Sequence, residues 1–506
     1  MTATTNALVG RSTSELRTLL KNKEVSSVEI LRAHQEHIKQ NEANVQAFLC
    51  LTPELAEQQA KNVDQMIARG DQLPALAGIP VALKDNMCVP GYPTTCASKI
   101  LKGFHSPYQS TAVTRLFDAG AVCLGKTNMD EFAMGSSTEN SAFQLTYNPW
   151  DKKYVPGGSS GGSAAAVSAG FSVISLGSDT GGSIRQPSAL CGVVGMKPTY
   201  GTVPRFGLVA FASSLDQIGP MARNVEDAAI TLSVIAGHDK RDSTSLPDFS
   251  AGQINYAKGL KDSSAEELAG GLKIGVIKEL NGEGIDLDIR KAVMATAEIF
   301  KKLGANVEEV SIPTAGHVLA VYYVIATAEA SANLSRYDGV RYGFRDEEAE
   351  DTLSMYMATR AQGFGPEVKR RIMLGTYALS SGYYDAYYKK AQQVRRLMKD
   401  DFDRIFSTYD LVICPTSPSV AFKVGEKTSD PLTMYLTDIA TIPANLAGLP
   451  GISIPAGFAA EGLPIGIQIL GNTLSDAKVL RAAAAFEKST EFHNKQTPML
   501  LTAMHK

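Results

Sequence analysis

The sequence has few of the residues that most often build metal and redox sites. It contains six cysteines and seven histidines in 506 residues, and no two cysteines form a C-x-x-C pair. Most of the cysteines lie in apolar or small-residue runs, such as AVCL at 121–124. This pattern is typical of reduced, buried thiols in a cytosolic protein. We therefore expect free cysteines and no metal site in this chain.

The chain also has little excess charge and no long apolar run. The net charge is −3, so the sequence gives no bulk basic field for direct binding of nucleic acid. Residues 1–11 lack a basic region followed by an apolar stretch, and no run approaches the roughly 18 apolar residues that a membrane span needs. These absences predict a cytoplasmic protein without membrane contact.

What the sequence does contain is an alternation of short apolar runs with helical patterns. The hydrophobic content is 44%, enough for a large core. Such an alternation predicts an α/β fold with a central mixed sheet covered by helices on both faces. We expect strands at 79–83, 121–125, 173–177, 274–277, 307–312, 410–415, 451–455 and 464–470. We expect helices from Ser27 through His34, at 53–69, 111–119, 163–169, 289–303 and 475–486, and several tyrosine-rich helices between 318 and 406. No linker or repeat divides the chain, so residues 1–506 are expected to form one domain.

Glycine and serine are concentrated between residues 156 and 198. The segment opens with PGGSSGGS at 156–163 and continues with DTGGSIR at 179–185. Glycine at this density makes poor regular structure, but it lets several N–H groups converge on one point. An oxyanion hole requires that arrangement, so this region is the candidate reaction site.

Three other motifs compete with this interpretation. The G-x-S-x-G match at 157–161 resembles a nucleophile elbow, which needs a later acid and histidine. The later histidines, at 238, 317, 493 and 505, do not follow core strands in an evident loop. The Walker A match at 120–127 places AVCL where a phosphate loop should be, so a helix stop, a buried strand and a turn are expected instead. A phosphate cradle at 158–162 lacks the acidic partner that binds a ribose.

Without histidine, lysine is the candidate base for a serine nucleophile. Burial favours the neutral amine, which can take a proton from a hydroxyl. Lys84 follows the apolar strand at 79–83, at the strand end where α/β folds build their sites. A lysine in such a place is more often a solvated residue at the rim of the sheet, so the position alone does not decide its role.

Longer blocks carry a family resemblance. Residues 156–166, 177–187 and 192–199, together with GIPVALKDN at 78–86 and GKTNMDEFAMGS at 125–136, resemble the amidase signature family. The resemblance implies a Ser-Ser-Lys triad, with Ser183 as nucleophile, Ser159 as the bridging serine and Lys84 as base. It also implies a cis peptide bond between Gly158 and Ser159. The signature core covers about residues 78–220, with helical insertions at about 318–406.

The backbone N–H groups near Ser183 are the expected donors to the oxyanion. The loop that precedes the nucleophile contains Thr180, Gly181 and Gly182. We expect these three residues to form the oxyanion hole.

The blocks at 335–343, 367–376, 380–388 and 435–451 narrow the resemblance to the glutamine-hydrolysing subunits of bacterial tRNA-dependent amidotransferases. Such a subunit releases ammonia from glutamine for the amidation of Glu-tRNA(Gln), Asp-tRNA(Asn) or both. In these enzymes a partner, the B subunit, binds the mischarged tRNA and uses ATP and magnesium, and a small C subunit joins the other two. The resemblance therefore implies no cofactor in this chain and no direct binding of tRNA.

For glutamine itself, the resemblance points to Arg371 for the α-carboxylate and Asp438 for the α-ammonium. Arginine suits a carboxylate because its fork binds two oxygens at once. The neighbouring Arg370 is the main competitor for the role of Arg371. Two alternatives stay open: a free-standing amidase that acts on small amides, and a binding subunit with an inactive site. The intact triad residues argue against the second.

Overall fold

The computed structural model describes residues 8–249, 252 and 254–504. Its centre is a mixed sheet of eleven strands in the order β1-β3-β2-β4-β6-β5-β10-β11-β9-β7-β8. The strands are β1 Phe48–Leu51, β2 Pro80–Lys84, β3 Val122–Thr127, β4 Ile174–Asp179, β5 Val194–Lys197, β6 Gln217–Ala222, β7 Lys273–Ile277, β8 Asn306–Val310, β9 Leu411–Pro415, β10 Gly451–Phe458 and β11 Pro464–Gly471. The predicted α/β fold with a mixed sheet is confirmed.

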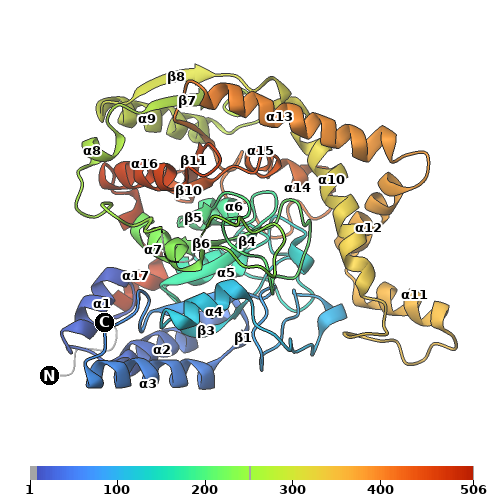
Figure 1. The fold of residues 1–506 in the computed structure, drawn as a ribbon, viewed down its shortest axis with the longest axis horizontal. Helices are drawn as coiled ribbons and strands as arrows, with labels where there is room; N and C mark the ends of the chain where they lie inside the picture. The colour runs from blue at the N-terminus through green and yellow to red at the C-terminus, as the bar shows by residue number, and fades with distance from the viewer. Residues whose placement is uncertain (1–7, 250–251, 253, 505–506) are drawn as a thin grey trace.

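Helices cover the sheet, and some of them project beyond it (Figure 1). The helices in the first 302 residues are α1 Thr13–Lys21, α2 Ser27–Val45, α3 Pro53–Arg69, α4 Thr111–Asp118, α5 Gly161–Ser168, α6 Arg185–Cys191, α7 Val225–Ile235, α8 Ala265–Ala269 and α9 Leu287–Lys302. The later helices are α10 Val318–Asn333, α11 Thr352–Gly363, α12 Pro366–Leu379, α13 Lys390–Phe406, α14 Pro431–Leu436, α15 Ile442–Leu446, α16 Asp476–Lys488 and α17 Pro498–Met504.

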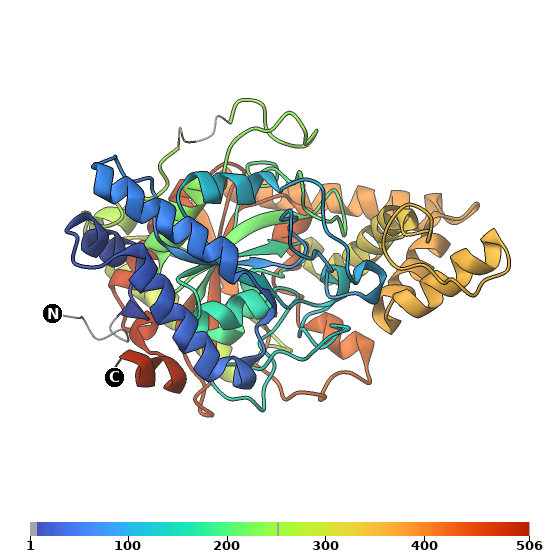
Figure 2. The ribbon, with the colours of Figure 1, turned by 90° about the horizontal axis from the view of Figure 1, so that it is seen from below.

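The core lies on both faces of the sheet because side chains alternate along each strand. In β9, Leu411 and Ile413 belong to one hydrophobic cluster, whereas Val412 and Cys414 belong to another. The first cluster includes residues of α7, α9 and α16, and the second includes Phe402 of α13. Figure 2 shows helices on both sides of the strands. This agrees with the expected helical cover on both faces.

Parallel strands place two chain segments at one edge of the sheet. β2 pairs in parallel with both β3 and β4. β2 ends at Lys84 and β4 ends at Asp179, so the segments that follow these two strands begin side by side. The loop after β4 carries Ser183. The candidate site therefore forms at the carboxyl ends of parallel strands, as is usual in α/β folds.

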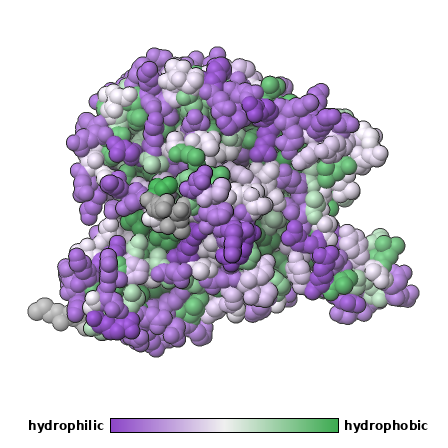
Figure 3. All heavy atoms as spheres, viewed as in Figure 1, coloured by the Kyte–Doolittle hydropathy of each residue, from purple (hydrophilic) through white to green (hydrophobic). Residues whose placement is uncertain are grey.

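Helices α10 to α13 occupy the predicted helical region and project from the sheet (Figure 1). Figure 3 shows apolar atoms on the projecting part. Exposed apolar or aromatic residues there include Leu353, Tyr356 and Met357 on α11 and Met373, Leu374 and Tyr377 on α12. Large exposed apolar groups of this kind are typical of surfaces that contact another protein.

One segment differs from the sequence analysis. Residues Pro313–Arg336 form a continuous helical segment of 24 residues that is long and apolar enough, by length and composition, to cross a membrane. Half of its most apolar stretch is buried inside the protein. The segment includes α10, and a Cβ atom added at Gly375 of α12 would lie 1.9 Å from the carbonyl oxygen of Thr327 in α10. This close packing is typical of a core helix.

Smaller differences concern how elements begin and end. Ser26, rather than Ser27, caps α2 by accepting a hydrogen bond from Glu29 N–H. The Walker-like segment is the buried strand β3, as predicted, but the strand continues through Lys126 and Thr127 instead of turning there. The Lys126 ammonium is buried against Asp85 at 2.8 Å. All six cysteines are free, in agreement with the sequence analysis.

Candidate active site

Lys84 and Ser159 are in direct contact inside the protein. Lys84 Nζ lies 2.7 Å from Ser159 Oγ, and both side chains have no exposed surface. Burial lowers the pKa of Lys84 to about 7, although the carboxylates of Asp130, Asp179 and Asp216 oppose the shift. A neutral amine is therefore well populated near pH 7, and its lone pair can accept a proton.

Ser183 lies beside this pair with its hydroxyl free. Its carbonyl oxygen accepts a hydrogen bond of 3.2 Å from Ser160 N–H, which ties the nucleophile loop to the Ser159 loop. Within the described part of the chain, no group forms a hydrogen bond with Ser183 Oγ. The side chain keeps 8% of its surface exposed. The structure thus contains the Lys84–Ser159 hydrogen bond of the predicted relay. Among the described residues, it does not contain a hydrogen bond between the Ser159 and Ser183 hydroxyl groups, and the Ser183 hydroxyl remains available to a substrate.

The loop that carries Ser159 has the backbone that the resemblance implied. The peptide bond between Gly158 and Ser159 is cis, so this prediction is confirmed. Gly158 N–H donates to Gln186 Oε1 at 3.0 Å. A side chain at Gly158 would collide with Asp130, because a Cβ atom there would lie 2.2 Å from Asp130 Oδ2. Glycine is required at this position by close packing.

The oxyanion loop differs in one respect from the expected set of donors. The N–H group of Gly182 donates to Asp179 Oδ1 at 2.9 Å and is not free to meet an oxyanion. The N–H groups of Gly181 and Ser183 have no acceptor among the residues that the structure describes. Thr180 uses its side chain to donate to Asp216 Oδ1 at 2.6 Å. Within the described residues, the free backbone donors of this loop are therefore Thr180, Gly181 and Ser183, whereas Gly182 is bonded.

A buried charge network holds the same loop. Asp179 also accepts a hydrogen bond from Ile184 N–H and pairs with Arg185 at 3.1 Å, and neither charged side chain is exposed. Burial alone would raise the pKa of Asp179, but Arg185 lowers it to about 2. Arg185 then bonds to Asn445 and Gln468, in the second half of the chain. The sequence analysis missed this role, although both charges flank the glycine pair in the quoted motif.

Arg371 is buried in an aromatic setting on α12. Its guanidinium lies 5.2 Å from the centre of the Tyr323 ring and 5.3 Å from that of Tyr435. Its Nε donates to Glu367 Oε1 at 2.7 Å, a partner that the sequence analysis did not foresee. Neither terminal nitrogen of Arg371 has an acceptor within the described residues. Two parallel N–H groups therefore remain for a carboxylate.

Arg370 differs from its neighbour in exposure. Its side chain is 44% exposed, against 3% for Arg371, and it forms an ion pair with the other oxygen of Glu367. A cavity of about 210 Å³ is bordered by both arginines, Glu139 and Lys427. The buried position of Arg371 makes it the better candidate for binding a substrate inside the protein.

Asp438 connects to the nucleophile loop through its own backbone. It accepts a hydrogen bond from the Ser136 hydroxyl, and only 8% of its surface is exposed. Burial raises the pKa of Asp438 to about 7, against the opposing effects of Ser136 and Arg371. The Thr441 hydroxyl donates to the carbonyl oxygens of both Asp438 and Gly181. This shared partner places Asp438 beside the oxyanion loop.

Tyr322 is a further residue at this point that the sequence analysis missed. A Cβ atom added at Gly181 would lie 2.7 Å from its phenol oxygen. The ring is buried, and its hydroxyl has no hydrogen-bond partner in the described part of the chain. Only the structure could reveal it, because Tyr322 lies in a tyrosine-rich helix with no distinguishing motif.

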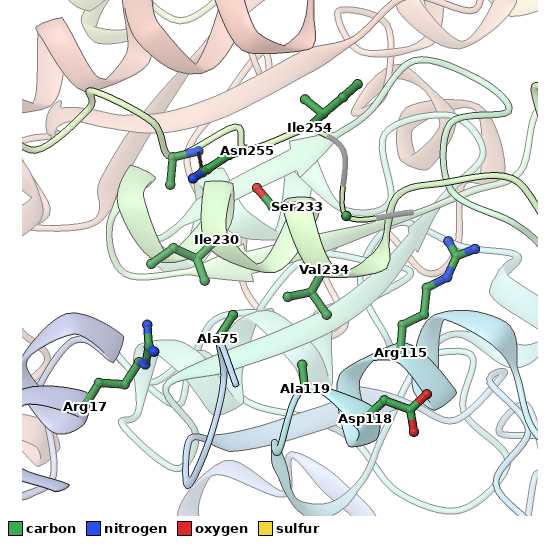
Figure 4. A pocket seen from close by; sticks show the side chains of 12 residues that line it. Arg17, Ala75, Arg115, Asp118, Ala119, Ile230, Ser233, Val234, Ile254 and Asn255 are labelled. Atoms are coloured by element: carbon green, nitrogen blue, oxygen red, sulfur yellow. Dashed lines mark hydrogen bonds between the residues drawn. The ribbon is translucent and has the colours of Figure 1, made fainter. Parts of the chain in front are cut away.

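A separate cavity of about 600 Å³ lies between α1, α4 and α7 (Figure 4). Its lining includes Arg17, Arg115 and Asp118. Lys84, Ser159 and Ser183 are not among the residues that line it. The cavity is therefore distinct from the candidate active site.

Comparison with known proteins agrees with this geometry. A family model described as Amidase matches residues 29–480. The A subunit of glutamyl-tRNA(Gln) amidotransferase from Cyanothece sp. is 58% identical over 488 residues, which are 96% of this chain and 99% of that protein. The protein of the same name from Acaryochloris marina is 59% identical over 95% of this chain and 98% of its own length.

Solved structures give the same result. The crystal structure of the A subunit of glutamyl-tRNA(Gln) amidotransferase from Thermotoga maritima has a TM-score of 0.74 and 44% identity, and the match covers 96% of this chain and 94% of that one. A bacterial aryl acylamidase of the amidase signature family has a TM-score of 0.83 and 25% identity, with 99% of each chain covered. The match therefore extends over almost the whole chain.

Proposed function

Because this chain belongs to the amidase family, we propose that it is the glutamine-hydrolysing subunit of a tRNA-dependent amidotransferase. The observation that carries the proposal is the buried contact of 2.7 Å between Lys84 and Ser159, on a loop that is hydrogen-bonded through Ser160 N–H to the backbone of Ser183. Relatives that share 58% of their residues with this chain bear the name of the A subunit of such an enzyme. The nucleophile is Ser183, and no metal or cofactor takes part in this chain's reaction.

The reaction begins with a proton transfer. Neutral Lys84 takes the proton of Ser159 while Ser159 takes that of Ser183, and Ser183 Oγ bonds to the side-chain amide carbon of glutamine. The carbonyl oxygen becomes negative and is stabilised by the N–H groups of Gly181 and Ser183. The C–N bond then breaks, and the proton returns from Lys84 through Ser159 to the leaving nitrogen. Ammonia leaves, and water later hydrolyses the acyl-enzyme to glutamate.

Recognition of glutamine requires two charges at the far end of the substrate. The two unpaired terminal nitrogens of Arg371 bind the α-carboxylate, and Asp438 binds the α-ammonium. The Tyr322 hydroxyl lies beside Gly181 of the oxyanion loop, where it can contact the substrate. Both groups are buried, so a substrate without a carboxylate would leave the terminal N–H groups of Arg371 without an acceptor, and one without an ammonium group would leave the Asp438 carboxylate without its partner.

The ammonia is then used by a partner. The names of the relatives imply other subunits, and the exposed apolar residues of α11 and α12 suit contact with another protein. The B subunit, with ATP and magnesium, amidates the mischarged tRNA, and the small C subunit joins the two larger proteins. The acceptor is Glu-tRNA(Gln), as in the names of the relatives, with Asp-tRNA(Asn) as a second candidate. The complex works in the cytoplasm, and the tRNA contacts the B subunit.

The test is to purify the chain with and without the B and C subunits and to measure glutamate release from glutamine. We expect glutamate release that Ser183→Ala abolishes, since general acid–base steps alone contribute roughly 10²–10⁴ to the rate. Normal release by Ser183→Ala would refute the assignment of the nucleophile. Rapid hydrolysis of small neutral amides together with no hydrolysis of glutamine would favour a free-standing amidase instead.

A further inference from the structure

Lys84 has more hydrogen-bond partners than a two-serine relay needs. Besides Ser159, its Nζ lies 2.8 Å from Ser160 Oγ and 3.0 Å from Ser178 Oγ. Asn86 Nδ2 lies 2.9 Å from the same Ser178 oxygen. All of these side chains are at most 2% exposed. The surroundings of the amine are therefore fixed by the protein and not by solvent.

The number of hydrogens on the amine limits how these contacts are used. A neutral primary amine has two N–H bonds and one lone pair, whereas three hydroxyl groups surround Lys84. Its lone pair must face Ser159 if it is to accept a proton from that residue. The Ser160 hydroxyl donates to the carbonyl oxygen of Ser178 at 3.1 Å, so its oxygen accepts from Lys84. The second N–H bond is left for Ser178, whose hydroxyl oxygen at 3.0 Å is nearer to Lys84 Nζ than its carbonyl oxygen at 3.3 Å.

We propose that Ser178, held by Asn86, is a positioning residue that takes one N–H bond of Lys84 and so turns the lone pair toward Ser159. The proposal deepens the proposed function and rests on Lys84 as the base. Ser178 does not touch the reacting atoms. It acts through the orientation of the amine, which a flexible lysine side chain cannot fix alone.

Asn86 is well placed to hold Ser178. It follows β2 by two residues, and its carbonyl oxygen accepts a hydrogen bond of 2.9 Å from Val209 N–H. Its side-chain oxygen is buried and has no partner within the described residues. If the nitrogen and oxygen of the Asn86 side-chain amide exchange places, the oxygen accepts a hydrogen bond from the Ser178 hydroxyl. The Ser178 hydroxyl then cannot donate to the lone pair of Lys84. Either orientation holds the Ser178 oxygen in place.

The proposal predicts the direction of a shift in pKa. The charged or titratable groups that face Lys84 are the carboxyl groups of Asp130, Asp179 and Asp216 and the thiol of Cys96. Ser178→Ala leaves all four unchanged. The protonated amine uses three N–H bonds, so an acceptor at Ser178 favours the charged form. Its removal should lower the pKa of Lys84 and move the acidic limb of the reaction to lower pH, while the maximal rate falls.

The experiment measures the triad without relying on glutamine. A fluorophosphonate reacts with the full-length chain across a range of pH, and intact mass reports labelling of Ser183. In this step Ser183 Oγ forms the P–O bond, fluoride leaves, and the serine proton passes to Lys84. We expect Ser178→Ala to lower the plateau rate about tenfold to a hundredfold and to shift the acidic limb downward. Steady-state glutamine hydrolysis should show a loss in kcat with little change in KM.

The matched control is Ser175→Ala. Ser175 is a buried serine on the same strand, and its hydroxyl donates to the Ser163 carbonyl at 2.9 Å without touching Lys84. Its loss should change the labelling rate by less than about threefold. Asn86→Asp provides a second variant, for which we expect a shift in the opposite direction. A carboxylate beside Ser178 should raise the pKa of Lys84 and move the acidic limb of the pH profile to higher pH.

Three results would overturn the proposal. The first is a Ser178→Ala profile that matches that of Ser175→Ala. The second is a uniform loss of rate without a shift, which indicates general damage to the fold. The third is a wild-type chain that is not labelled at Ser183, which contradicts the proposed function as well. Wild-type labelling without glutamate release, together with the expected shift, would refute glutamine as substrate and support the role of Ser178.

Discussion

Burial shifts the pKa of two residues of the candidate site, and the proposed mechanism assigns them to different ends of the substrate. Burial lowers the pKa of Lys84 to about 7 and raises the pKa of Asp438 to about 7. Lys84 must be neutral to take a proton, and Asp438 must be ionised to hold an ammonium group. Both conditions are met above pH 7 and lost below it, so protonation of Lys84 and protonation of Asp438 both lower the activity as the pH falls.

This coincidence predicts a steep acidic limb. Well below about pH 7, both Lys84 and Asp438 are protonated, so kcat/KM for glutamine should fall about a hundredfold per pH unit. kcat depends on Lys84 alone and should fall about tenfold per pH unit. Asp438→Asn should lower kcat/KM at every pH and leave a single-proton limb. The measurement is a profile of both constants from about pH 5 to about pH 9. Unchanged activity down to pH 5 would contradict the role of Lys84 as base.

The proposed recognition of glutamine can be tested at the same scale. Arg371→Ala should lower kcat/KM for glutamine about a hundredfold, because a buried substrate carboxylate loses its partner. Hydrolysis of propionamide, which has no carboxylate, should change by less than about threefold. Arg370→Ala is the matched control, since it removes a more exposed arginine that shares Glu367. Equal losses on both substrates would show that Arg371 supports the fold or the triad instead.

Sequence reasoning reached the residues that lie in motifs and missed those that only folding brings in. Lys84, Ser159 and Ser183 stand in long blocks whose spacing identifies them. Ser178 and Tyr322 were missed, since a serine in a strand and a tyrosine in a helix carry no local signal of function. The sequence also predicted Gly182 N–H as a donor to the oxyanion. It could not show that this N–H group donates to Asp179 instead.

At the scale of elements, the packing of α10 against α12 positions Arg371, the arginine that we propose binds glutamine. Tyr322 and Tyr323 lie on α10, and Arg371 lies on α12, one turn before Gly375. The two helices approach so closely that a Cβ atom at Gly375 would lie 1.9 Å from the carbonyl oxygen of Thr327. The distance between the helices is therefore set by a glycine, because no other residue fits.

Gly375→Ala should push the two helices apart. We expect the free energy of unfolding to fall by about 1–3 kcal/mol, the usual cost of overpacking. KM for glutamine should rise because Arg371 moves with α12, while propionamide hydrolysis is retained. Gly316→Ala serves as the control, since a Cβ atom at that position meets no atom within 4 Å. Thermal unfolding and steady-state kinetics of both variants give the measurement, and equal stability of the two would contradict the packing argument.

Most elements with strong apolar periodicity were predicted, although helix α7 was not, and several elements that contain glycine or proline were missed. The eight expected strands are all present, whereas β1, β5 and β6 were missed. β5 and β6 contain VGMK and QIGPMA, in which glycine and proline hide the strand pattern. Helix α6 was missed for a similar reason, because Pro187 lies inside it. Tertiary pairing with β4 and β10 supplies what local preference does not.

At the scale of the whole molecule, the sheet joins two halves of the chain at one site. β5 pairs with β10, and Arg185 bonds to Asn445 and Gln468, so the nucleophile loop is fixed by residues more than 250 positions away. The sequence predicted the class of fold from its alternating pattern. It could not predict the strand order, because pairing between distant strands leaves no mark on local composition.

The proposed role within an amidotransferase has a consequence for the whole assembly, because the ammonia must not escape. The Ser183 side chain is only 8% exposed, so the product forms inside the protein. Ammonia that reached bulk water would be protonated and would lose its nucleophilic lone pair.

We expect the complex with the B and C subunits to transfer nitrogen from amide-labelled ¹⁵N-glutamine to tRNA without dilution by excess unlabelled ammonium. Mass spectrometry of the amidated product measures the isotope. A complex with Ser183→Ala should lose transfer from glutamine but keep slow use of free ammonium. Product whose label matches the bulk pool would show that ammonia is released before it is used, and the chain would then act as an independent amidase.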